Sequence, residues 1–509
     1  VTPGRLAEHI HGLEQVRELA QFFAPESVAE ACGIEAETIR ALARDLAAAQ
    51  RAAVYGRIGT CTQEFGTLAS WLVDVLNVLT GNLDREGGAM FSKAAVGAKN
   101  AAGTPGKGRG VRFGRWKSRV SGLPEVYGEL PASCLAEEIE TPGNGQVRAM
   151  ITLAGNPALS TPNSKRLQQS LETLEFMVSV DMYLNETTRY ANVILPPPSS
   201  LARSHYDLAF YQFAVHNVAN YSAPIFERES GMVDEWEIFL RLAGILGGQG
   251  AQADVQLIDE MSIAMLVQRE VATAGSSIEG RDSGELLAAL KARRGPERML
   301  DFMLRSGPYG DGFGAQEDGL SLAILEAHPH GVDLGPLQPR IPEVLRTPTG
   351  KIELAPPAIV ADVERLRASL ERTKEGVNGQ MLLIGRRDLR SNNSWMHNLN
   401  VLTKGKERCT LLIHSIDATR LALADGEMAC VTSLAGAVEI LVEVTDEIMP
   451  GVVSIPHGWG HNLSGTRMRV AREHAGVNTN ILTVAGDVDP LSGNAVLNGV
   501  AVTVEKSLS

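Results

Sequence analysis

The chain has 509 residues, of which 44% are hydrophobic and 21% are charged, so it is long enough to form several domains around buried cores. Its net charge of -13 disfavours an extended phosphate-binding surface, and therefore nucleic acid as a partner. No stretch approaches the about 18 consecutive apolar residues that a membrane-spanning helix needs, and the first residues lack the regions of a signal peptide. We therefore expect no membrane span and, by default, a cytoplasmic location.

The cysteines are too scattered to suggest a metal centre. None forms a CxxC pair, and no His/Cys cluster has metal-ligand spacing, so we assign no metal ligand to this chain. We expect reduced, buried thiols at Cys32, Cys61, Cys134, Cys409 and Cys430.

The first part of the chain reads as helices followed by one strand and another helix. Residues 4–50 carry apolar residues at helical spacing. The apolar run AAVYGRIG at 52–59 predicts a strand that ends in glycine, and the sequence at 67–83 predicts the next helix. A strand, a glycine-containing turn and a helix are typical of a parallel α/β sheet.

A second α/β run follows a long segment without periodicity at 91–146, which is rich in Gly, Pro, Lys and Arg. We expect strands in QVRAMITLAGNP, EFMVSVD and NVILPPP, with helical segments in NSKRLQQSLETL and NETTRYA between them. Such alternation predicts a parallel sheet that holds ligands at the carboxyl ends of its strands.

The C-terminal part has a different pattern. Helices are expected to about residue 305 and again near 360–372, whereas short alternating strands separated by turns begin at Gly379. The predicted fold is therefore α/β, with two Rossmann-like parallel-sheet domains, the first incomplete at its N-terminus, and a C-terminal β-barrel. We place a first α/β domain at 1–110, a second with helical insertions at 111–375, and the barrel at 376–509.

Three predicted strand ends contain glycine, in the strings GRIG at 56–59, GNP at 155–157 and GRR at 385–387. Backbone N–H groups at such ends can meet phosphates, especially where a helix follows. None of the three is a GxGxxG fingerprint or a P-loop, so an NAD-dependent enzyme has no direct support. For each string by itself, a structural turn is the favoured interpretation.

The neighbouring motifs add a family resemblance. ITLAGNPALSTPN followed by VSVDMYLNETTRYANVILPPPS resembles the molybdopterin oxidoreductases of the dimethyl sulfoxide reductase and formate dehydrogenase superfamily, with Asn192 where the family usually has Asp. VYGRIGTCTQEFGTLASWLVDVLNVLTGNLDREGGAMF, TPTGKIEL, GRRDLRSNNSWMHN, IPHGWGHN and GVNTNILT are similar to further segments of that family.

The resemblance implies a pterin-dinucleotide-binding portion of a molybdenum or tungsten oxidoreductase, formate-dehydrogenase-like in character, with bis-molybdopterin guanine dinucleotide as its cofactor. It also implies a small-molecule redox substrate and an electron-transfer subunit or carrier. The family's iron–sulfur motif and metal ligand are expected upstream of Val1, so the chain alone is expected to be inactive and its catalytic residues are left unassigned. A non-catalytic scaffold subunit that keeps the fold without the cofactor is the alternative.

The resemblance also nominates the residues that would bind the cofactor. Asp181 would accept hydrogen bonds from guanine or ribose, and the amides around Asn156 would hold phosphate. The full set of expected cofactor-binding residues is Gly59, Gly155, Asn156, Pro157, Asp181, Thr187, Gly385, Arg386, Arg387, Asn392, Asn393, Ser394, His457, Trp459 and Asn478.

Several of these residues have plainer alternatives. Asp181 could cap the segment that begins at Tyr183, Asn156 could be a turn residue before Pro157, and Arg387 could pair with a surface carboxylate. His457 and Trp459 could equally be packed turn residues. His205, His216 and His397 suit proton transfer by their titration range, but a hydrogen-bonded structural histidine is the favoured interpretation for each.

Overall fold

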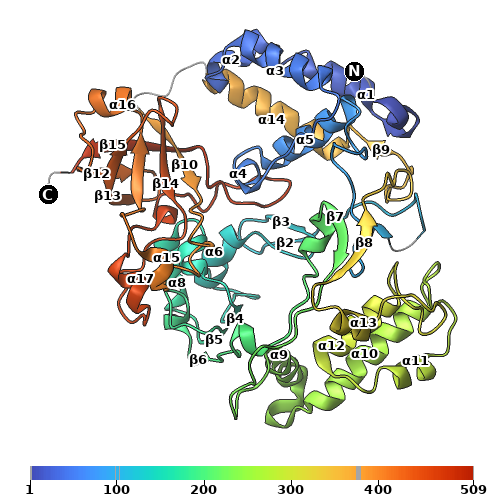
Figure 1. The fold of residues 1–509 in the computed structure, drawn as a ribbon. Helices are drawn as coiled ribbons and strands as arrows, with labels where there is room; N and C mark the ends of the chain where they lie inside the picture. The colour runs from blue at the N-terminus through green and yellow to red at the C-terminus, as the bar shows by residue number, and fades with distance from the viewer. Residues whose placement is uncertain (1–2, 98, 102–103, 374–379, 508–509) are drawn as a thin grey trace.

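The computed structural model describes residues 3–97, 99–101, 104–373 and 380–507. It is a mixed α/β structure with parallel sheets and a closed six-strand barrel, which confirms the predicted fold class (Figure 1). The predicted domain boundary between residues 375 and 376 lies outside the described residues.

The N-terminal region is helical, as predicted, and a late segment of the chain completes it. Strand β9 (Ile352–Glu353) pairs in parallel with β1 (Ile10–His11), and α14 (Pro357–Thr373) packs on the N-terminal helices (Figure 1). Leu354 shares a core with Val78. The three-domain division stays a prediction, but these segments belong together in space. The other elements here are η1 (Gly4–His9), α1 (Leu13–Ala20), α2 (Pro25–Cys32), α3 (Ala36–Ala48), α4 (Ile58–Cys61) and α5 (Gly66–Leu79).

The prediction of a strand at 52–59 is wrong. Residues 52–57 have no strand pairing, and residues 58–59 already belong to α4. The Val54 N–H donates to Asn77 Oδ1 and the Asn77 Nδ2 donates to the Val54 carbonyl, both at 2.9 Å. One buried side chain on α5 thus satisfies the backbone groups that a neighbouring strand would otherwise pair.

The segment predicted to be irregular contains some regular structure. Strands β2 (Phe113–Lys117) and β3 (Pro124–Val126) form an antiparallel hairpin. The buried Glu125 carboxylate accepts hydrogen bonds from the Arg115 side chain across this hairpin. Because the order depends on this contact and not on alternating apolar residues, the sequence pattern gave no sign of it. The remaining elements are η2 (Lys99–Ala101), η3 (Ala132–Cys134) and α6 (Leu135–Glu140).

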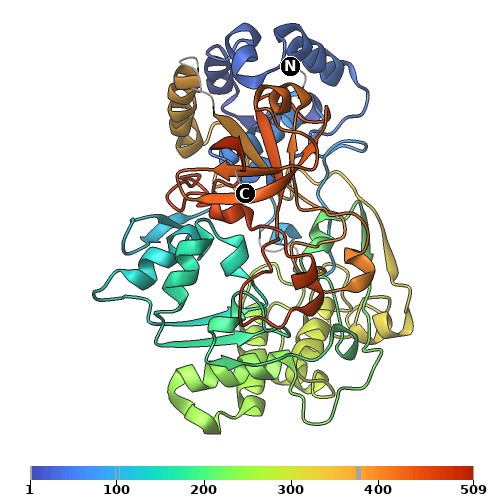
Figure 2. The same ribbon diagram turned by 90° about the vertical axis from the view of Figure 1, so that its left-hand side faces the viewer.

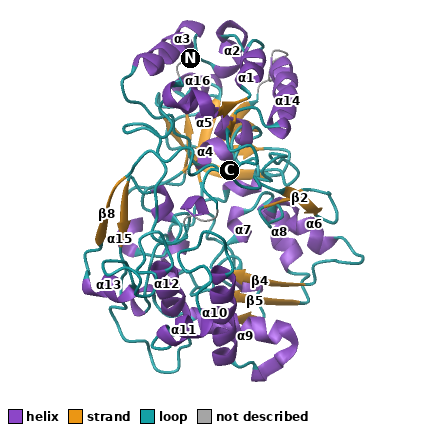
Figure 3. Ribbon diagram, turned by 90° about the vertical axis from the view of Figure 1, so that its right-hand side faces the viewer, coloured by secondary structure: helices purple, strands orange, loops and turns teal. Residues whose placement is uncertain are grey.

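The second α/β region is built on a three-stranded parallel sheet of order β4-β5-β6, with strands β4 (Ala149–Leu153), β5 (Phe176–Val180) and β6 (Val193–Ile194). The helices α6 and α8 (Ser164–Leu171) contact each other and cover one face, where Leu167 and Met177 are fully buried (Figure 3). Asn192 Oδ1 accepts the Met177 N–H at 2.7 Å, as an Asp carboxylate at that position could also do.

A helical layer lies to the right of this sheet in Figure 1. Its helices pack around Ile263, Leu286 and Phe302, and the antiparallel pair β7 (His216–Ala219) and β8 (Val332–Pro336) lies at its edge. The predicted helices here are confirmed. The elements are η4 (Thr188–Tyr190), η5 (Ser200–Ala202), η6 (Phe210–Phe213), α9 (Glu235–Gly244), η7 (Ile245–Gln249), η8 (Gly250–Gln252), α10 (Val255–Val271), α11 (Ser283–Ala289), α12 (Gly295–Arg305) and α13 (Leu322–Ala327).

The C-terminal barrel closes in the strand order β10-β14-β11-β13-β12-β15. The short strands predicted for the C-terminal part are present, and their inward side chains, such as Ile413 and Val453, form one buried core. Figure 2 shows the barrel between the N-terminal helices and the lower regions. Its elements are β10 (Met381–Arg386), α15 (Asn400–Thr403), β11 (Thr410–Ile413), α16 (Ser415–Arg420), β12 (Met428–Thr432), β13 (Ala437–Val444), β14 (Val452–Pro456), α17 (Arg469–Glu473), η9 (Thr479–Ile481) and β15 (Val500–Lys506).

Candidate functional site

The carboxyl ends of β4 and β5 bring the first predicted site residues together. Leu153 and Val180 are register partners at the ends of these parallel strands, and the turn at 155–157 and Asp181 follow them. The Ala154 N–H donates to the Val180 carbonyl at 2.9 Å and so holds the two chain exits side by side. This is the edge at which parallel sheets commonly hold ligands.

The Asn156 side chain is fixed by two hydrogen bonds. Its Nδ2 donates to Glu186 Oε2 at 2.9 Å, and its Oδ1 accepts from the Thr187 hydroxyl at 2.7 Å. The Thr187 oxygen in turn accepts the Ala158 N–H at 3.0 Å. The predicted residues Asn156 and Thr187 therefore share one network, in which one amide hydrogen of Asn156 remains available to a ligand.

Asp181 is buried and caps its own turn. Its Oδ1 accepts the Tyr183 N–H and its Oδ2 accepts from Asn185 Nδ2, both at 3.0 Å. Burial raises the pKa of the Asp181 carboxyl, and these hydrogen bonds partly oppose that rise. The capping interpretation thus has a direct contact, while each carboxylate oxygen keeps a further lone pair for guanine or ribose donors.

A buried polar chain continues from Glu186 into the barrel. Glu186 Oε1 lies 2.9 Å from His461 Nδ1, and His461 Nε2 lies 2.8 Å from His397 Nδ1. The His397 ring stacks on Trp459, with ring centroids 4.0 Å apart. Sequence reasoning missed Glu186 and His461, because they are 275 residues apart and neither has a distinctive spacing.

Arg386 and Arg387 behave differently although they are adjacent. Arg386 donates to the carbonyls of Ser454 at 2.6 Å and Thr410 at 2.8 Å, so its guanidinium fastens barrel strands together. Arg387 is more exposed and donates to Asn393 Oδ1. Burial lowers the pKa of both guanidinium groups. These contacts leave Arg387 better placed than Arg386 to reach a ligand.

The loop that follows Arg387 is strained and closely packed. Asn392 and Asn393 have positive φ angles of 42° and 62°, and Ser394 is buried. A Cβ on Gly458 would lie 2.1 Å from the Asn393 carbonyl, so only glycine lets the PHGWGH turn approach this loop. The predicted residues Asn392, Asn393 and Ser394 therefore lie beside the predicted residues His457 and Trp459.

His457 and Trp459 are both packed in that turn. The His457 N–H donates to the Arg386 carbonyl at 3.0 Å, and burial together with the nearby Arg387 charge lowers the pKa of His457 to about 4. Trp459 is buried, and its Nε1 has no hydrogen-bond partner among the described residues. An unpaired buried donor of this kind is costly unless a water or a ligand accepts from it.

Asn478 and Asn480 tie the barrel to the turn region. Asn478 Nδ2 donates to Ser164 Oγ at 2.9 Å and to the Ala158 carbonyl at 3.3 Å. Asn480 Nδ2 donates to the Leu159 carbonyl at 2.6 Å. The predicted residue Asn478 thus contacts the segment that carries Asn156, although both of these amide contacts are to protein atoms.

Gly59 and Gly385 lie away from that network, near a cavity of about 740 Å³ between the N-terminal region and the barrel. Gly59 and Asn498 line this cavity, and Asn498 Oδ1 accepts the Gly385 N–H at 2.8 Å. Asn498 Nδ2 also donates to the Thr62 hydroxyl at 2.8 Å. Asp489 Oδ1 is buried and has no hydrogen-bond partner among the described residues, although Arg365 Nη2 lies 3.8 Å away. The structure therefore groups the fifteen predicted residues around two places.

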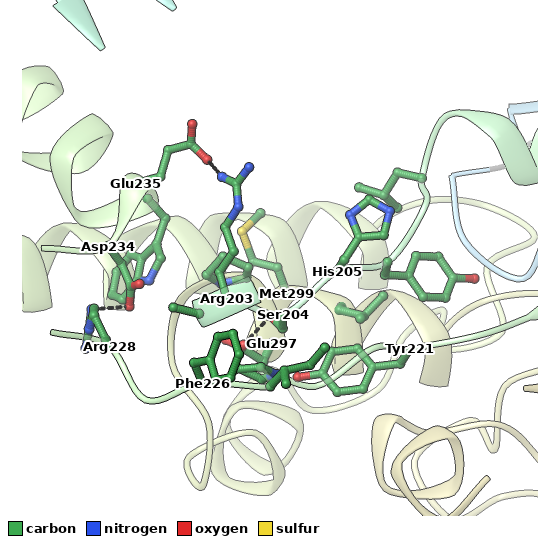
Figure 4. A pocket seen from close by; sticks show the side chains of 18 of the residues that line it. Arg203, Ser204, His205, Tyr221, Phe226, Arg228, Asp234, Glu235, Glu297 and Met299 are labelled. Atoms are coloured by element: carbon green, nitrogen blue, oxygen red, sulfur yellow. Dashed lines mark hydrogen bonds and ion pairs between the residues drawn. The ribbon is translucent and has the colours of Figure 1, made fainter. Parts of the chain in front are cut away.

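A larger cavity of about 990 Å³ contains none of the predicted cofactor-binding residues (Figure 4). His205 lines it together with Tyr221. Some of its polar side chains are paired with one another, including Ser204 with Glu297 at 2.6 Å and Arg228 with Asp234 at 2.5 Å. The Tyr206 hydroxyl, which also lines the cavity, is buried and has no hydrogen-bond partner among the described residues. We assign no ligand to this cavity.

The polar groups of this site fit a pterin dinucleotide. Asp181 offers a carboxylate that accepts hydrogen bonds, and Arg387 offers an outward guanidinium that donates them. Trp459 Nε1 offers a donor that has no hydrogen-bond partner among the described residues. Within residues 3–97, 99–101, 104–373 and 380–507, no three His, Cys, Asp or Glu side chains gather as a metal site, and the cysteines there form no disulfide. No helix in these ranges is long and apolar enough to cross a membrane.

Comparison with known proteins matches two family models. Residues 26–201 match the molybdopterin oxidoreductase model, and residues 381–501 match the molydopterin dinucleotide binding domain. Among curated proteins, formate dehydrogenase H of Escherichia coli is 26% identical over 38% of this chain and 28% of its own length. The dimethyl sulfoxide/trimethylamine N-oxide reductase of Cereibacter sphaeroides is 24% identical over 85% of this chain and 52% of its own length.

A solved structure agrees on the fold. Acetylene hydratase from Pelobacter acetylenicus superimposes with a TM-score of 0.68 at 17% identity, covering 99% of this chain and 67% of that one. The chain spans about half, or less, of the length of the formate dehydrogenase and of the dimethyl sulfoxide/trimethylamine N-oxide reductase that it matches.

Proposed function

Because the chain belongs to the dimethyl sulfoxide reductase and formate dehydrogenase superfamily of molybdopterin oxidoreductases, we propose that it is the pterin-dinucleotide-binding portion of a molybdenum or tungsten oxidoreductase. The bound cofactor would supply two-electron redox chemistry at its metal. We assign no metal ligand to the described residues.

The observation that carries the proposal is the joining of two distant segments at one site. Asn478, at the end of the barrel sequence, donates to Ser164 and to the Ala158 carbonyl beside the Asn156 turn. His397, three residues after the loop at 387–394, reaches the same interface through His461, which contacts Glu186. Donors and acceptors from both domains therefore face one region, as a long and polar dinucleotide requires.

Each residue has a specific role in this proposal. Asp181 would accept from guanine or ribose, with its rotamer held by Tyr183 and Asn185. Arg387 and the amides of the turn at 155–157 would donate to phosphate oxygens. The partnerless Trp459 Nε1 would donate to an oxygen of the ligand. Arg386 would act indirectly, because it holds the strand from which Arg387 projects.

The proposal includes a small-molecule redox substrate and an electron-transfer subunit or carrier. Formate-dehydrogenase-like chemistry is the specific version we propose, supported by the sequence likeness to a formate dehydrogenase.

The test is to purify the chain from a host that makes the cofactor and to measure oxidised pterin by fluorescence, released guanine nucleotide by chromatography, and molybdenum and tungsten by mass spectrometry. We expect pterin and guanine nucleotide to co-purify with the chain. Asp181→Ala should retain at least about tenfold less of both, equivalent to about 1.4 kcal/mol of binding. Asp318→Ala, which removes an exposed carboxylate, is the control.

A folded chain that carries neither pterin nor nucleotide would contradict the proposal and favour the scaffold alternative. Equal retention by wild type and Asp181→Ala would remove Asp181 from the site while leaving the rest of the proposal in place.

A further inference from the structure

The buried chain from Asn156 to Trp459 contains three titratable side chains in direct succession. Glu186 and His461 are fully buried and His397 is 2% exposed. The contacts are 2.9 Å from Glu186 Oε1 to His461 Nδ1 and 2.8 Å from His461 Nε2 to His397 Nδ1. Among the ion pairs of the described residues, no lysine or arginine side chain contacts Glu186, and His461 is its partner.

Each of these contacts needs one proton between its two atoms, and this requirement limits the protonation states. Glu186 accepts, so His461 Nδ1 carries a proton. The proton between the two histidines belongs either to His461 Nε2, which makes His461 an imidazolium, or to His397 Nδ1, which leaves both rings neutral. In the first state His397 carries its own proton on Nε2, and in the second His397 Nε2 is bare. The two states differ by one proton.

The charges that face the chain support a single mobile proton. Burial tends to raise the pKa of Glu186, but the hydrogen bond and charge of His461, with the hydrogen bond from Asn156, bring it below its usual range. Burial, and then the charge of His461, lower the pKa of His397 to about 3, although Asp388, the Gly458 carbonyl and Glu186 oppose that shift. Two simultaneous imidazolium rings are therefore disfavoured.

We propose that Glu186, His461 and His397 form a buried one-proton relay, in which a proton taken up at Nε2 of His397 places the positive charge on His461 beside Glu186. The Nε2 of His397 gains an N–H bond, its Nδ1–H bond breaks, and Nε2 of His461 gains that proton. One proton is taken up from an acid in the surrounding solution or ligand, and no electron moves.

The position of the relay gives it two ends with different surroundings. At one end, His397 Nε2 and Trp459 Nε1 are buried on stacked rings, and neither atom has a hydrogen-bond partner among the described residues. At the other end, Glu186 accepts from Asn156 Nδ2. Proton uptake on the barrel side therefore changes the charge beside the turn of the second α/β region without a charged group crossing the interface.

The relay is independent of whether the chain binds a pterin, so its test does not use the cofactor. Histidine-selective 15N labelling of the chain allows protonated and bare ring nitrogens to be distinguished by their chemical shifts. As the pH is raised, we expect the two rings together to lose one proton in a single step, in which the His397 proton moves from Nε2 to Nδ1. His397 should show two protonated nitrogens at no point of the titration.

Three results would overturn the proposal: His397 titrating alone, His461 titrating while His397 keeps its proton on the same nitrogen, or no change in either ring. This measurement needs only the wild-type chain, so it does not depend on whether a variant folds. His397→Gln and His461→Gln would assign the two sets of signals by their loss.

A charge-removing variant tests the role of the carboxylate. Glu186→Gln keeps an acceptor near His461 but removes the negative charge, so we expect the shared step to move to lower pH by at least about one unit, a tenfold loss of proton affinity. An unchanged midpoint would contradict the assigned role of Glu186. His414→Gln removes another barrel histidine, one that lies 3.7 Å from Asp446, and should leave the shared step unchanged.

Discussion

The barrel and the β4-β5-β6 sheet bury their apolar side chains to different extents. In the barrel every strand has two neighbours, and inward residues such as Leu411 and Val453 have no exposed surface. The parallel sheet is covered by helices on one face, whereas Leu153 is 55% exposed and Phe176 is 48% exposed on its strands. The barrel therefore closes its apolar core with its own strands. The position of the sheet depends more on the contacts that its turns make.

That difference explains where the candidate site lies. The sheet offers its carboxyl edge, and the barrel supplies buried amide side chains that fix this edge in place. A closed barrel can carry such fixed groups because its core holds their backbone rigidly. The predictions below compare the barrel core, the contact between the two regions, and one titrating barrel residue.

The largest expected effect is on the barrel core. Leu411→Ala should lower the free energy of unfolding by about 2–5 kcal/mol, because a fully buried leucine leaves a cavity that the closed strands cannot fill. Leu153→Ala on the exposed part of the sheet is the matched control and should change it by less than about 0.5 kcal/mol. Urea denaturation followed by fluorescence measures both, and equal losses would contradict the contrast between the two regions.

A smaller effect is expected where the two regions meet. Asn480→Ala should weaken their contact by about 1–3 kcal/mol, because the buried Leu159 carbonyl loses the donor that lies 2.6 Å away. Hydrogen exchange should accelerate around α7 (Pro157–Ser160) and α8, while the barrel strands stay protected. The exposed Asn400 provides the control, as Asn400→Ala. Uniformly faster exchange throughout the barrel would instead indicate that Asn480 supports the barrel itself.

The third prediction concerns the effect of His457 on the pH dependence of stability, which is the smallest of the three effects at neutral pH. Burial lowers its pKa from 6.5 to about 4, so between these values the unfolded chain binds a proton that the folded chain does not. Stability therefore falls as pH decreases through this window, by about 2 kcal/mol at pH 5 from this group. His457→Gln should show a shallower fall in melting temperature from pH 7 to 4 than wild type. Parallel curves would mean that folding does not change the pKa of His457.

The sequence predicted the barrel strands well because their alternation of apolar and polar residues is local. It also placed Asn156 and Asp181 at one sheet edge, since the exits of adjacent parallel strands meet. The strand at 52–59 failed for a physical reason: apolar composition favours an extended chain, but pairing needs a neighbour, and here Asn77 takes that place.

Individual site roles were harder to predict. Arg386 and Arg387 are identical in type and adjacent, yet one donates to barrel carbonyls and the other projects outward. Arg386 is the last residue of β10 and Arg387 lies beyond it, so the alternation of side chains along a strand does not set the direction of Arg387. Glu186 and His461 could not be paired in advance, since their contact joins segments 275 residues apart.

By itself, the sequence determined the α/β and barrel character of this protein, its family, and the turn that carries Asn156, because these depend on periodicity and on motifs within short segments. Only the tertiary structure decided which donors are already used, that His461 lies between Glu186 and His397, and that Asn478 and Asn480 hold the two regions together. Those features depend on long-range packing and on burial, which set both the partners of a polar group and its pKa.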